Sequence, residues 1–511
     1  MNPVIGIDLG TTNSAVAYTD PQGTTTTIAG TDGTRIVPSA IRFPPGADPV
    51  VGKQAKQYAV VEPDRVAQFF KRGMGEKTFL PDDAPFVVDG KTWSPEELSS
   101  LVLRKLKQMA EQHFGQPVSR AVITVPAYFG EPERAATRDA GELAGLEVVR
   151  IINEPTAAAL AHGVDQGGEP GNVLVFDLGG GTFDVTVMTV GADRAMEVIA
   201  TGGDRRLGGI DFDRRILERI VQTVAAETGT DLNADTWALS EAMETAEQLK
   251  IELSAVETAT RRIIAGGRPV LFSLGRQELE KLLADKLQEV EDTVVYTIQE
   301  RAGLKSSDIG TVLLVGGSSR IPAFQRLLAR ISGLQPRFSR NLDEDVARGA
   351  AIMAAKLGGE LDARSELAHL PPPVNVASHG LGVTIVGEHG TDVNEVMIPE
   401  GATIPAVVSH QFGAVEDGQT HVRVVLNEGE DSDLEFVRQL GDAVGPLGRP
   451  VRRGHPIRID MQYTADQLII VKAYDGETSQ FICELELRYQ GRLSEKEKNA
   501  AHNYLSRLDV G

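Results

Sequence analysis

Cysteine is almost missing from this sequence: Cys483 is the single one in 511 residues. One cysteine excludes a disulfide within the chain and a zinc site built from several cysteines, and it suits a reducing compartment. No apolar run reaches the roughly 18 residues of a membrane-spanning helix. The first residues lack the basic and long apolar segments of a secretion signal. We therefore expect a soluble, cytoplasmic protein without a membrane partner.

Positive charge is also scarce. The chain has 51 Lys and Arg against 72 Asp and Glu, a formal net charge of −21. Binding to nucleic acid or anionic lipid depends on clustered Lys and Arg, so this balance argues against both as the main partner. With 41% hydrophobic and 24% charged residues, the composition is that of a soluble protein with large cores. The length predicts about three domains.

Three segments repeat one pattern, an apolar strand followed by a turn rich in glycine and hydroxyl side chains. They span residues 4–14, 173–184 and 312–320. The first two share an Asp-Leu-Gly step at Asp8 and Asp177, which indicates an internal duplication with two similar halves facing each other across a cleft. Strand–glycine turns occur in many α/β proteins, but the shared position of the aspartate makes that simpler interpretation less satisfactory.

These turns have the chemistry of a nucleotide site. Neither of the first two contains the Walker A pattern Gly-x-x-x-x-Gly-Lys-Ser/Thr. Backbone N–H groups of a tight glycine turn can nevertheless converge on phosphate oxygens. Asp8 and Asp177 each end a strand directly before such a turn, and paired carboxylates suit a hydrated Mg²⁺. We expect a magnesium–nucleotide complex between two lobes; as an alternative, the aspartates could simply cap their turns.

The rest of the chain falls into an α/β part and an all-β part. Ser94, Pro95 and Glu97 predict a capped amphipathic helix, and strands and helices alternate over 1–360. The prolines of 370–374 predict a stiff extended linker. Short strand patterns follow, with turns between them, typical of a compact antiparallel β-sandwich. The predicted strands are 380–386, 394–398, 404–412, 420–426, 433–438, 456–463, 467–474 and 479–489. A capping box at Ser494 and Glu497 predicts a last helix.

The motifs of residues 1–357 resemble those of the actin-like ATPases and, within them, of the 70-kDa heat shock protein (DnaK-type) chaperones. Residues 5–14 and 176–184 are similar to the two phosphate loops of the family, and 123–129 and 150–159 to its central motifs. The resemblance implies a two-lobed α/β ATPase domain with duplicated ribonuclease H-like folds, followed by an all-β sandwich and a short terminal helix. The predicted boundaries are 1–362 for the ATPase domain, 363–377 for the linker, 378–490 for the sandwich and 491–511 for the helix.

The resemblance also implies roles for individual residues around ATP or ADP and Mg²⁺. Asp8 and Asp177 would hold the metal through water, Lys71 would reach the γ-phosphate and the attacking water, Glu154 would organise the metal–water shell, and Thr182 would lie near the γ-phosphate. The phosphates would lie against Gly10, Thr11, Thr12, Asn13, Gly179, Gly180, Gly181, Gly208 and Gly209. Glu247, Lys250, Ser254, Gly316, Gly317, Ser318, Arg320 and Asp343 would surround the adenosine. Taken alone, Glu247, Lys250 and Ser254 form a polar helical stripe that could equally be plain surface.

The resemblance is weaker after the linker, and it departs from the family in two places. Val383, Val386, Val422 and Val424 would line a groove for an extended peptide, although alternating valines also suit any sandwich core. Pro126 and Arg134 resemble the relay between nucleotide and linker. The three prolines make docking of the linker as a strand doubtful, because proline lacks the N–H donor. The last helix resembles the start of the family's lid, and we expect a groove without a full lid to exchange peptide quickly in both nucleotide states.

We expect an ATP-hydrolysing chaperone-like protein whose sandwich binds polypeptide segments or one specific client. A J-domain co-chaperone and a nucleotide exchange factor are the further partners that the resemblance suggests. The main alternative is a nucleotide-switched scaffold that docks one specific partner and has no general chaperone activity. A small-molecule kinase on the same ATPase fold is a third reading, disfavoured because the motifs match over the whole ATPase region and no substrate insert is present.

Overall fold

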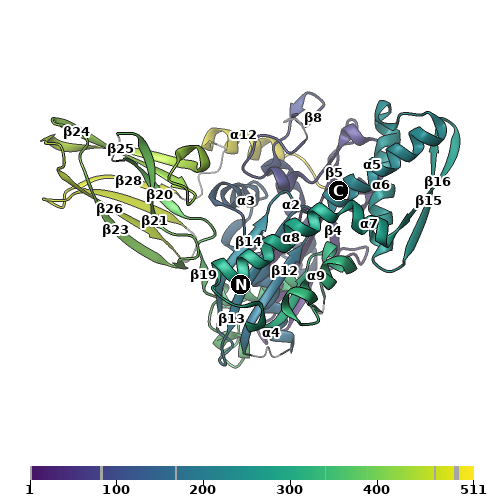
Figure 1. Cartoon of the computed structure of the whole chain (residues 1–511), viewed down its shortest axis with the longest axis horizontal. Coiled ribbons are helices and arrows are strands. Elements are labelled where there is room, and N and C mark those ends of the chain that lie inside the picture. The colour runs from purple at the N-terminus through teal and green to yellow at the C-terminus, as the bar shows by residue number, and fades with distance from the viewer. Residues whose placement is uncertain are drawn as a thin grey trace.

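A computed structural model shows a two-lobed α/β part with a β-sandwich set to one side (Figure 1). The structure describes residues 3–80, 84–166, 170–339, 341–387, 390–464, 468–487 and 494–511. Each lobe is built on a five-strand path of mixed direction, and the sandwich consists of two four-stranded sheets. No helix of these ranges is long and apolar enough to cross a membrane. The mixed α/β and all-β parts agree with the predicted fold class.

The two lobes repeat one strand order, which confirms the duplication inferred from the sequence. Lobe I has the order β3–β2–β1–β10–β11, with β4 also paired to β2, and lobe II has the order β14–β13–β12–β17–β18. In each, the first strand pairs antiparallel with the second and parallel with a later one. The strands of lobe I are β1 (Val4–Asp8), β2 (Asn13–Thr19), β3 (Thr25–Thr27), β4 (Ile36–Pro38), β10 (Arg120–Val125) and β11 (Glu147–Asn153). Those of lobe II are β12 (Gly171–Leu178), β13 (Phe183–Val190), β14 (Met196–Asp204), β17 (Ile309–Val315) and β18 (Arg337–Phe338).

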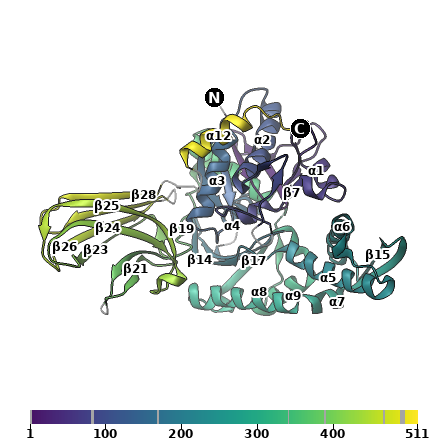
Figure 2. The same ribbon diagram turned by 90° about the horizontal axis from the view of Figure 1, so that it is seen from above.

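Helices cover both sheets, and two of them fill the space between the lobes. Between the sheets lie α4 (Glu154–Gln166) and α10 (Asp345–Gly358), which share an apolar cluster with both. They cross so closely that a Cβ on Gly349 would lie 1.8 Å from the Ala157 carbonyl oxygen. The helices α2 (Pro95–Phe114) and α3 (Glu131–Leu143) cover the outer face of lobe I (Figure 2). The predicted capping box of α2 is confirmed: Ser94 and Glu97 each bond the other's backbone N–H.

Smaller elements extend the lobes on either side of the cleft. Lobe I carries α1 (Lys53–Tyr58), the three-stranded sheet β6–β5–β7 and the hairpin β8–β9, and lobe II carries the hairpin β15–β16 with several outer helices. The strands are β5 (Ala40–Arg42), β6 (Val50–Val51), β7 (Val66–Gln68), β8 (Val87–Val88), β9 (Lys91–Thr92), β15 (Thr258–Ala265) and β16 (Arg268–Gly275). The helices of lobe II are α5 (Gly209–Thr228), α6 (Thr236–Leu253), α7 (Arg276–Leu282), α8 (Ala284–Tyr296) and α9 (Pro322–Ser332).

The sandwich buries one apolar core between its two sheets. Their strand orders are β21–β20–β24–β25 and β23–β26–β27–β28, and the short pair β19–β22 lies at the entry. The strands are β19 (Asn375–Val376), β20 (Leu381–Val386), β21 (Asp392–Ile398), β22 (Thr403–Ile404), β23 (Ala406–Gly413), β24 (Gln419–Glu428), β25 (Arg438–Val451), β26 (Pro456–Tyr463), β27 (Ile469–Asp475) and β28 (Phe481–Leu487). The ends of the predicted strands 467–474 and 479–489 include residues outside the described ranges.

One predicted strand of the sandwich is wrong. Residues Leu434–Phe436 form a 3₁₀ turn, and the strand of this region is β25, which begins at Arg438 and runs through Pro446 and Pro450. Prolines usually end a central strand, but β25 pairs only with β24 and lies at the edge of its sheet, where prolines are tolerated because N–H groups are needed on one side alone.

The linker contacts lobe II without forming a strand over its leucines or its prolines, in agreement with the expectation drawn from the prolines. Residues Glu366–His369 form the short helix α11, and Lys356 binds the carbonyl oxygens of Leu367 and Leu370 at its end. Val374, the first residue after the prolines, has the backbone N–H that proline lacks. It donates to Met196 O at 2.9 Å and accepts from Val198 N at 2.9 Å, as a parallel bridge to β14. The prolines therefore prevent backbone hydrogen bonds to β14 only at their own positions, and Val374 after them can still form such bonds.

The last helix, α12 (Glu495–Leu505), lies on lobe I rather than on the sandwich (Figures 1 and 2). Its predicted capping box is confirmed. Leu505 and Val510 are buried in the core of lobe I, and Arg104 of α2 donates to the carbonyl oxygens of Leu505 and Leu508. Lys498 of α12 pairs with Asp139 of α3. Both ends of the sandwich are therefore attached to the two-lobed domain.

Candidate nucleotide site

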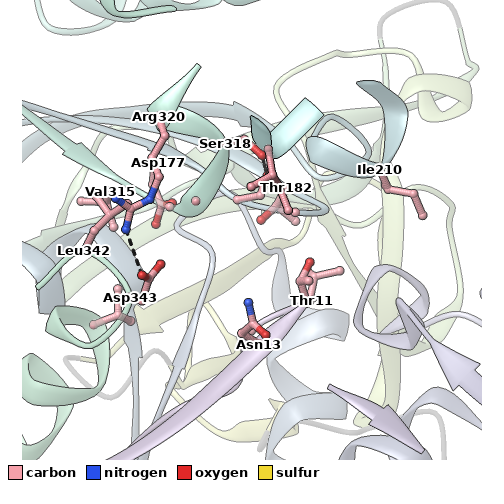
Figure 3. A pocket seen from close by; sticks show the side chains of 18 of the residues that line it. Thr11, Asn13, Asp177, Thr182, Ile210, Val315, Ser318, Arg320, Leu342 and Asp343 are labelled. Atoms are coloured by element: carbon pink, nitrogen blue, oxygen red, sulfur yellow. Dashed lines mark hydrogen bonds and ion pairs between the residues drawn. The ribbon is translucent and has the colours of Figure 1, made fainter. Parts of the chain in front are cut away.

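The two duplicated turns meet in the cleft between the lobes. Asp8 and Asp177 end β1 and β12, and the turns that follow each connect the first strand of a lobe to its second. A Cβ on Gly181 would lie 2.4 Å from Thr11 Cγ2, so the turns lie against one another. Around them is a cavity of about 320 Å³. Figure 3 shows Thr11 and Asn13 on one side of the cavity and Thr182 and Ser318 on the opposite side.

Nearly all residues that the sequence predicts for nucleotide binding lie around this one cavity. The lining includes Asp8, Gly10, Thr11, Thr12, Asn13, Lys71, Glu154, Asp177, Gly179, Gly180, Thr182, Glu247, Lys250, Ser254, Gly316, Gly317, Ser318, Arg320 and Asp343. Gly181, Gly208 and Gly209 lie just behind it: Gly209 N donates to Gly179 O at 3.0 Å, and Ser318 Oγ donates to the same oxygen at 2.8 Å. Their roles toward a ligand stay predictions.

Buried charge is concentrated at the closed end of the cavity. Lys71 is 2% exposed, and its Nζ lies 2.6 Å from Glu154 Oε1. Burial, together with the charge of Glu154, raises the pKa of Asp8 and of Asp184 to about 7, and burial also raises the pKa of Asp177. One lysine does not balance four carboxyl groups, so this end of the cavity favours a further cation.

The donor set suits a cation held through water. Within the described ranges, no group of three or more His, Cys, Asp or Glu side chains could hold a metal ion directly. The carboxylates of Asp8 and Asp177 instead come from opposite lobes beside a cavity with room for water. Mg²⁺ prefers oxygen ligands and keeps several of its waters, so these residues fit it.

The wider end of the cavity combines polar groups with apolar walls. Lys250 of α6 pairs with Asp213 of α5 at 2.7 Å, and Arg320 pairs with Asp343 at 2.9 Å (Figure 3). Ile210, Ile251, Leu342 and Val346 supply apolar surface. Such walls with a few polar groups are typical of a site for a planar base and a sugar. Glu247, Lys250 and Ser254 do share one face here, as their spacing predicts.

Sequence reasoning missed several residues of the site. Asp184, the last residue of the 176–184 motif, and Asp213, four residues after Gly209, were given no role, although they are 1% and 4% exposed. Tyr128 N donates to Asp184 Oδ1 at 2.8 Å, and Asp213 is the partner of Lys250. The available signal in the sequence was their closeness to residues that had been assigned a role, Thr182 and Gly209. The apolar walls carried no such signal, because an isolated Ile or Leu looks the same in any core.

The proposed relay lies between the cavity and the sandwich. Arg134 is 2% exposed and donates to Phe129 O at 2.9 Å and to Asn153 Oδ1 at 2.8 Å. Asn153 directly precedes Glu154, and Pro126 begins the segment that Arg134 holds. From the sandwich side, Ser378 Oγ donates to Ala127 O at 2.8 Å.

Three of the four valines predicted for the peptide groove lie in the sandwich core. Val383, Val422 and Val424 are 1%, 6% and 3% exposed and belong to its apolar cluster, whereas Val386 is 46% exposed. In this structure the first three therefore pack in the sandwich core, which was the alternative to a role in a peptide groove. Their contribution to peptide binding stays a prediction.

An ion pair closes the mouth of the cleft. Lys56 Nζ of α1 in lobe I lies 2.7 Å from Glu247 Oε1 of α6 in lobe II. Because the pair must separate when the lobes open, we expect Lys56→Ala to speed release of bound ADP. Half-exposed pairs contribute about 0.2–1 kcal/mol, so the rate should rise roughly two- to fivefold.

Stopped-flow release of a fluorescent ADP analogue measures this rate. Lys53→Ala is the matched control, because Lys53 lies on the same helix and is exposed. Equal release rates from the Lys56 and Lys53 variants would show that the Lys56–Glu247 ion pair does not hold the lobes together.

A duplicated two-lobed α/β domain with a phosphate turn from each lobe defines an ATPase of the actin-like class. A family model described as "Hsp70 protein" matches residues 4–503. The curated relatives include "Chaperone protein DnaK" from Thermotoga neapolitana, 39% identical over 480 residues, which cover 92% of this chain and 78% of the relative. Those of Thermotoga petrophila and Thermotoga maritima are 38% identical over the same shares.

This chain belongs to the Hsp70 family. It is an ATP-dependent molecular chaperone, and its enzymatic activity is ATP hydrolysis, as in the family. The family binds nucleotide and polypeptide substrates. The alternative of a scaffold without chaperone activity is not favoured, and the resemblance inferred from the motifs is confirmed.

Proposed function

We propose that the cleft binds one magnesium–ATP complex through Asp8 and Asp177, and that its hydrolysis controls polypeptide binding by the sandwich. The observation that carries this proposal is the convergence of two acid-ended turns, one from each lobe, on a single cavity. Magnesium bound there would supply positive charge to the phosphate oxygens. Asp8 and Asp177 would hold it through water, and Glu154 would orient that water shell.

The other residues of the cavity position ATP and neutralise its charge. Lys71 is held by Glu154 and would direct its ammonium to the γ-phosphate and the attacking water, with Thr182 beside it. The backbone N–H groups of both turns would surround the remaining phosphate oxygens. Glu247, Lys250, Ser254, Arg320 and Asp343 would bind the adenosine.

Calorimetric titration with ATP tests the proposal, once with magnesium and once with EDTA. We expect removal of the metal to weaken ATP binding at least about tenfold, or 1.4 kcal/mol. In Asp8→Asn this metal dependence should largely disappear. Binding that is equally tight in EDTA, or no binding of ATP at all, would overturn the proposed site.

The finer assignments of partners follow from family membership. We propose that extended polypeptide segments bind the sandwich, and that Pro126 and Arg134 transmit the nucleotide state to it through the docked linker. A J-domain co-chaperone and a nucleotide exchange factor are the proposed regulators. The cytoplasm is the proposed compartment, and it suits a chain with a single, buried cysteine.

A further inference from the structure

Two glutamates from different domains meet where the sandwich docks on lobe I. Glu131 is the first residue of α3, and Glu428 is the last residue of β24. Glu428 Oε1 accepts a hydrogen bond from Glu131 N at 2.9 Å. Gly130, the N-cap of α3, has no side chain with which to cap its own helix, and a Cβ there would lie 2.5 Å from Glu428 Oε2. The sandwich thus supplies the cap of a lobe I helix.

The carboxyl group of Glu131 is buried at this contact without a partner. Glu131 is 5% exposed, and neither of its oxygens has a hydrogen-bond partner among the described residues. A buried carboxylate without a partner is costly, and a second negative charge nearby increases the cost. Burial and the facing charge of Glu428 raise the pKa of Glu131 to about 8.

Charged groups from both domains surround Glu131. Glu428 of the sandwich accepts a hydrogen bond from Glu131 N at the start of α3. The groups of α3 that act on Glu131 are Glu133, Arg134 and Arg138. Glu133 is already engaged by Arg438 of β25 and by Arg205 after β14. The two arginines of α3 lower the pKa of Glu131, but by less than burial and Glu428 raise it.

We propose that docking of the sandwich on lobe I takes up a proton at Glu131, so that docking is favoured at low pH and weakens as the pH rises. Glu428 belongs to the sandwich, so its charge faces Glu131 only in the docked arrangement. Undocking removes this charge and so lowers the pKa of Glu131, down to the ordinary glutamate value of about 4.3 where its burial is also lost. This proposal does not depend on the nucleotide site, and its failure would leave that site intact.

The sign of the linkage follows from the two pKa values. The docked state holds the proton up to about pH 8, and the undocked state loses it above about pH 4.3. Between these limits the docking constant falls as the pH rises. If the whole shift arises on docking, the constant falls about fivefold between pH 7 and pH 8.

A second carboxyl group at the domain contacts also titrates in this pH range. Asp139 of α3 faces Lys498 of α12, and burial raises its pKa to about 7. The contribution of Glu131 is therefore isolated by comparing variants that leave Asp139 unchanged.

Small-angle X-ray scattering on the full chain measures docking through the radius of gyration. The series covers pH 6 to 9 at the urea concentration where half of the wild-type molecules are open at pH 7. We expect the open fraction of the wild type to rise with pH. Glu131→Gln keeps the shape of the side chain without the titration, and its open fraction should change at most half as steeply between pH 7 and 8.

Two further variants keep the test sharp. Glu428→Gln still accepts from Glu131 N but removes the facing charge, so it should strengthen docking above pH 7 and flatten its pH dependence. Glu227→Gln removes an exposed charge from α5 and should behave as the wild type. Circular dichroism checks that every variant is folded. Wild-type docking that is independent of pH, or an unchanged slope in Glu131→Gln, would overturn the proposal.

Discussion

Lys71→Ala is expected to bind ATP but to lose its hydrolysis. The Lys71 ammonium lies at the end of the cavity that Asp8, Asp177 and Glu154 line, and it is held 2.6 Å from Glu154. In the proposed complex its charge would face the position where negative charge develops on the transferred phosphoryl group. Removing one such preorganised group costs about 100-fold or more in kcat. ATP affinity should change much less, because most phosphate contacts in the proposed complex would come from the turns.

Single-turnover hydrolysis of radiolabelled ATP separates the chemical step from binding, which calorimetry measures on the same sample. Lys77→Ala is the matched control, because Lys77 is an exposed lysine of the same lobe. A single-turnover rate of the Lys71 variant within threefold of the wild-type rate would contradict a catalytic role for Lys71.

Gly208→Val is expected to abolish tight ATP binding while the domain stays folded. Gly208 precedes α5, and its Cα packs on the backbone of the second phosphate turn. A Cβ there would lie 2.6 Å from Gly181 N and 2.7 Å from Gly180 C. A valine would push the start of α5 away from the turn and break the bond from Gly209 N to Gly179 O. Overpacking of 1–3 kcal/mol at this point corresponds to an affinity loss of up to about 100-fold.

Gly310→Val provides the comparison, because Gly310 is exposed in β17 and its Cβ would make only an ordinary contact at 3.6 Å. Thermal melting followed by circular dichroism distinguishes lost binding from lost folding. If Gly208→Val bound ATP as tightly as Gly310→Val, the close packing of helix and turn would not matter for the site.

Local signals predicted much of the fold. The capping boxes at Ser94 and Ser494 depend on residues three positions apart, and both formed as expected. The duplicated turns were visible because each lobe repeats strand, aspartate and glycine. The prediction failed at β25, since an edge strand tolerates the prolines that would end a central one. Whether a strand is central or at an edge depends on partners far away in the sequence.

The sequence predicted the site residues that belong to a recognisable motif. It could not single out residues that are part of the site only because folding buries them there. Asp8, Asp177 and the glycine turns could be recognised in the sequence by their residue types and their repeated spacing. Lys71 follows two phenylalanines and looks like any surface lysine, yet it is 2% exposed beside Glu154, 83 residues later. The docking of Val374 was missed for a related reason: three prolines dominate the local pattern, and the strand that receives Val374 lies much earlier in the chain.

The contact between α12 and lobe I gives the molecule an optical reporter of its own opening. Trp93 is 3% exposed. Its ring packs edge-to-face with that of Tyr504 of α12, with 5.9 Å between the ring centres. The Lys91 ammonium lies 4.3 Å from the centre of the Trp93 ring. The second of the two tryptophans, Trp237, is 52% exposed on α6. With Trp237 replaced by phenylalanine, the emission of a single indole would follow the departure of the last helix in real time, without any attached dye.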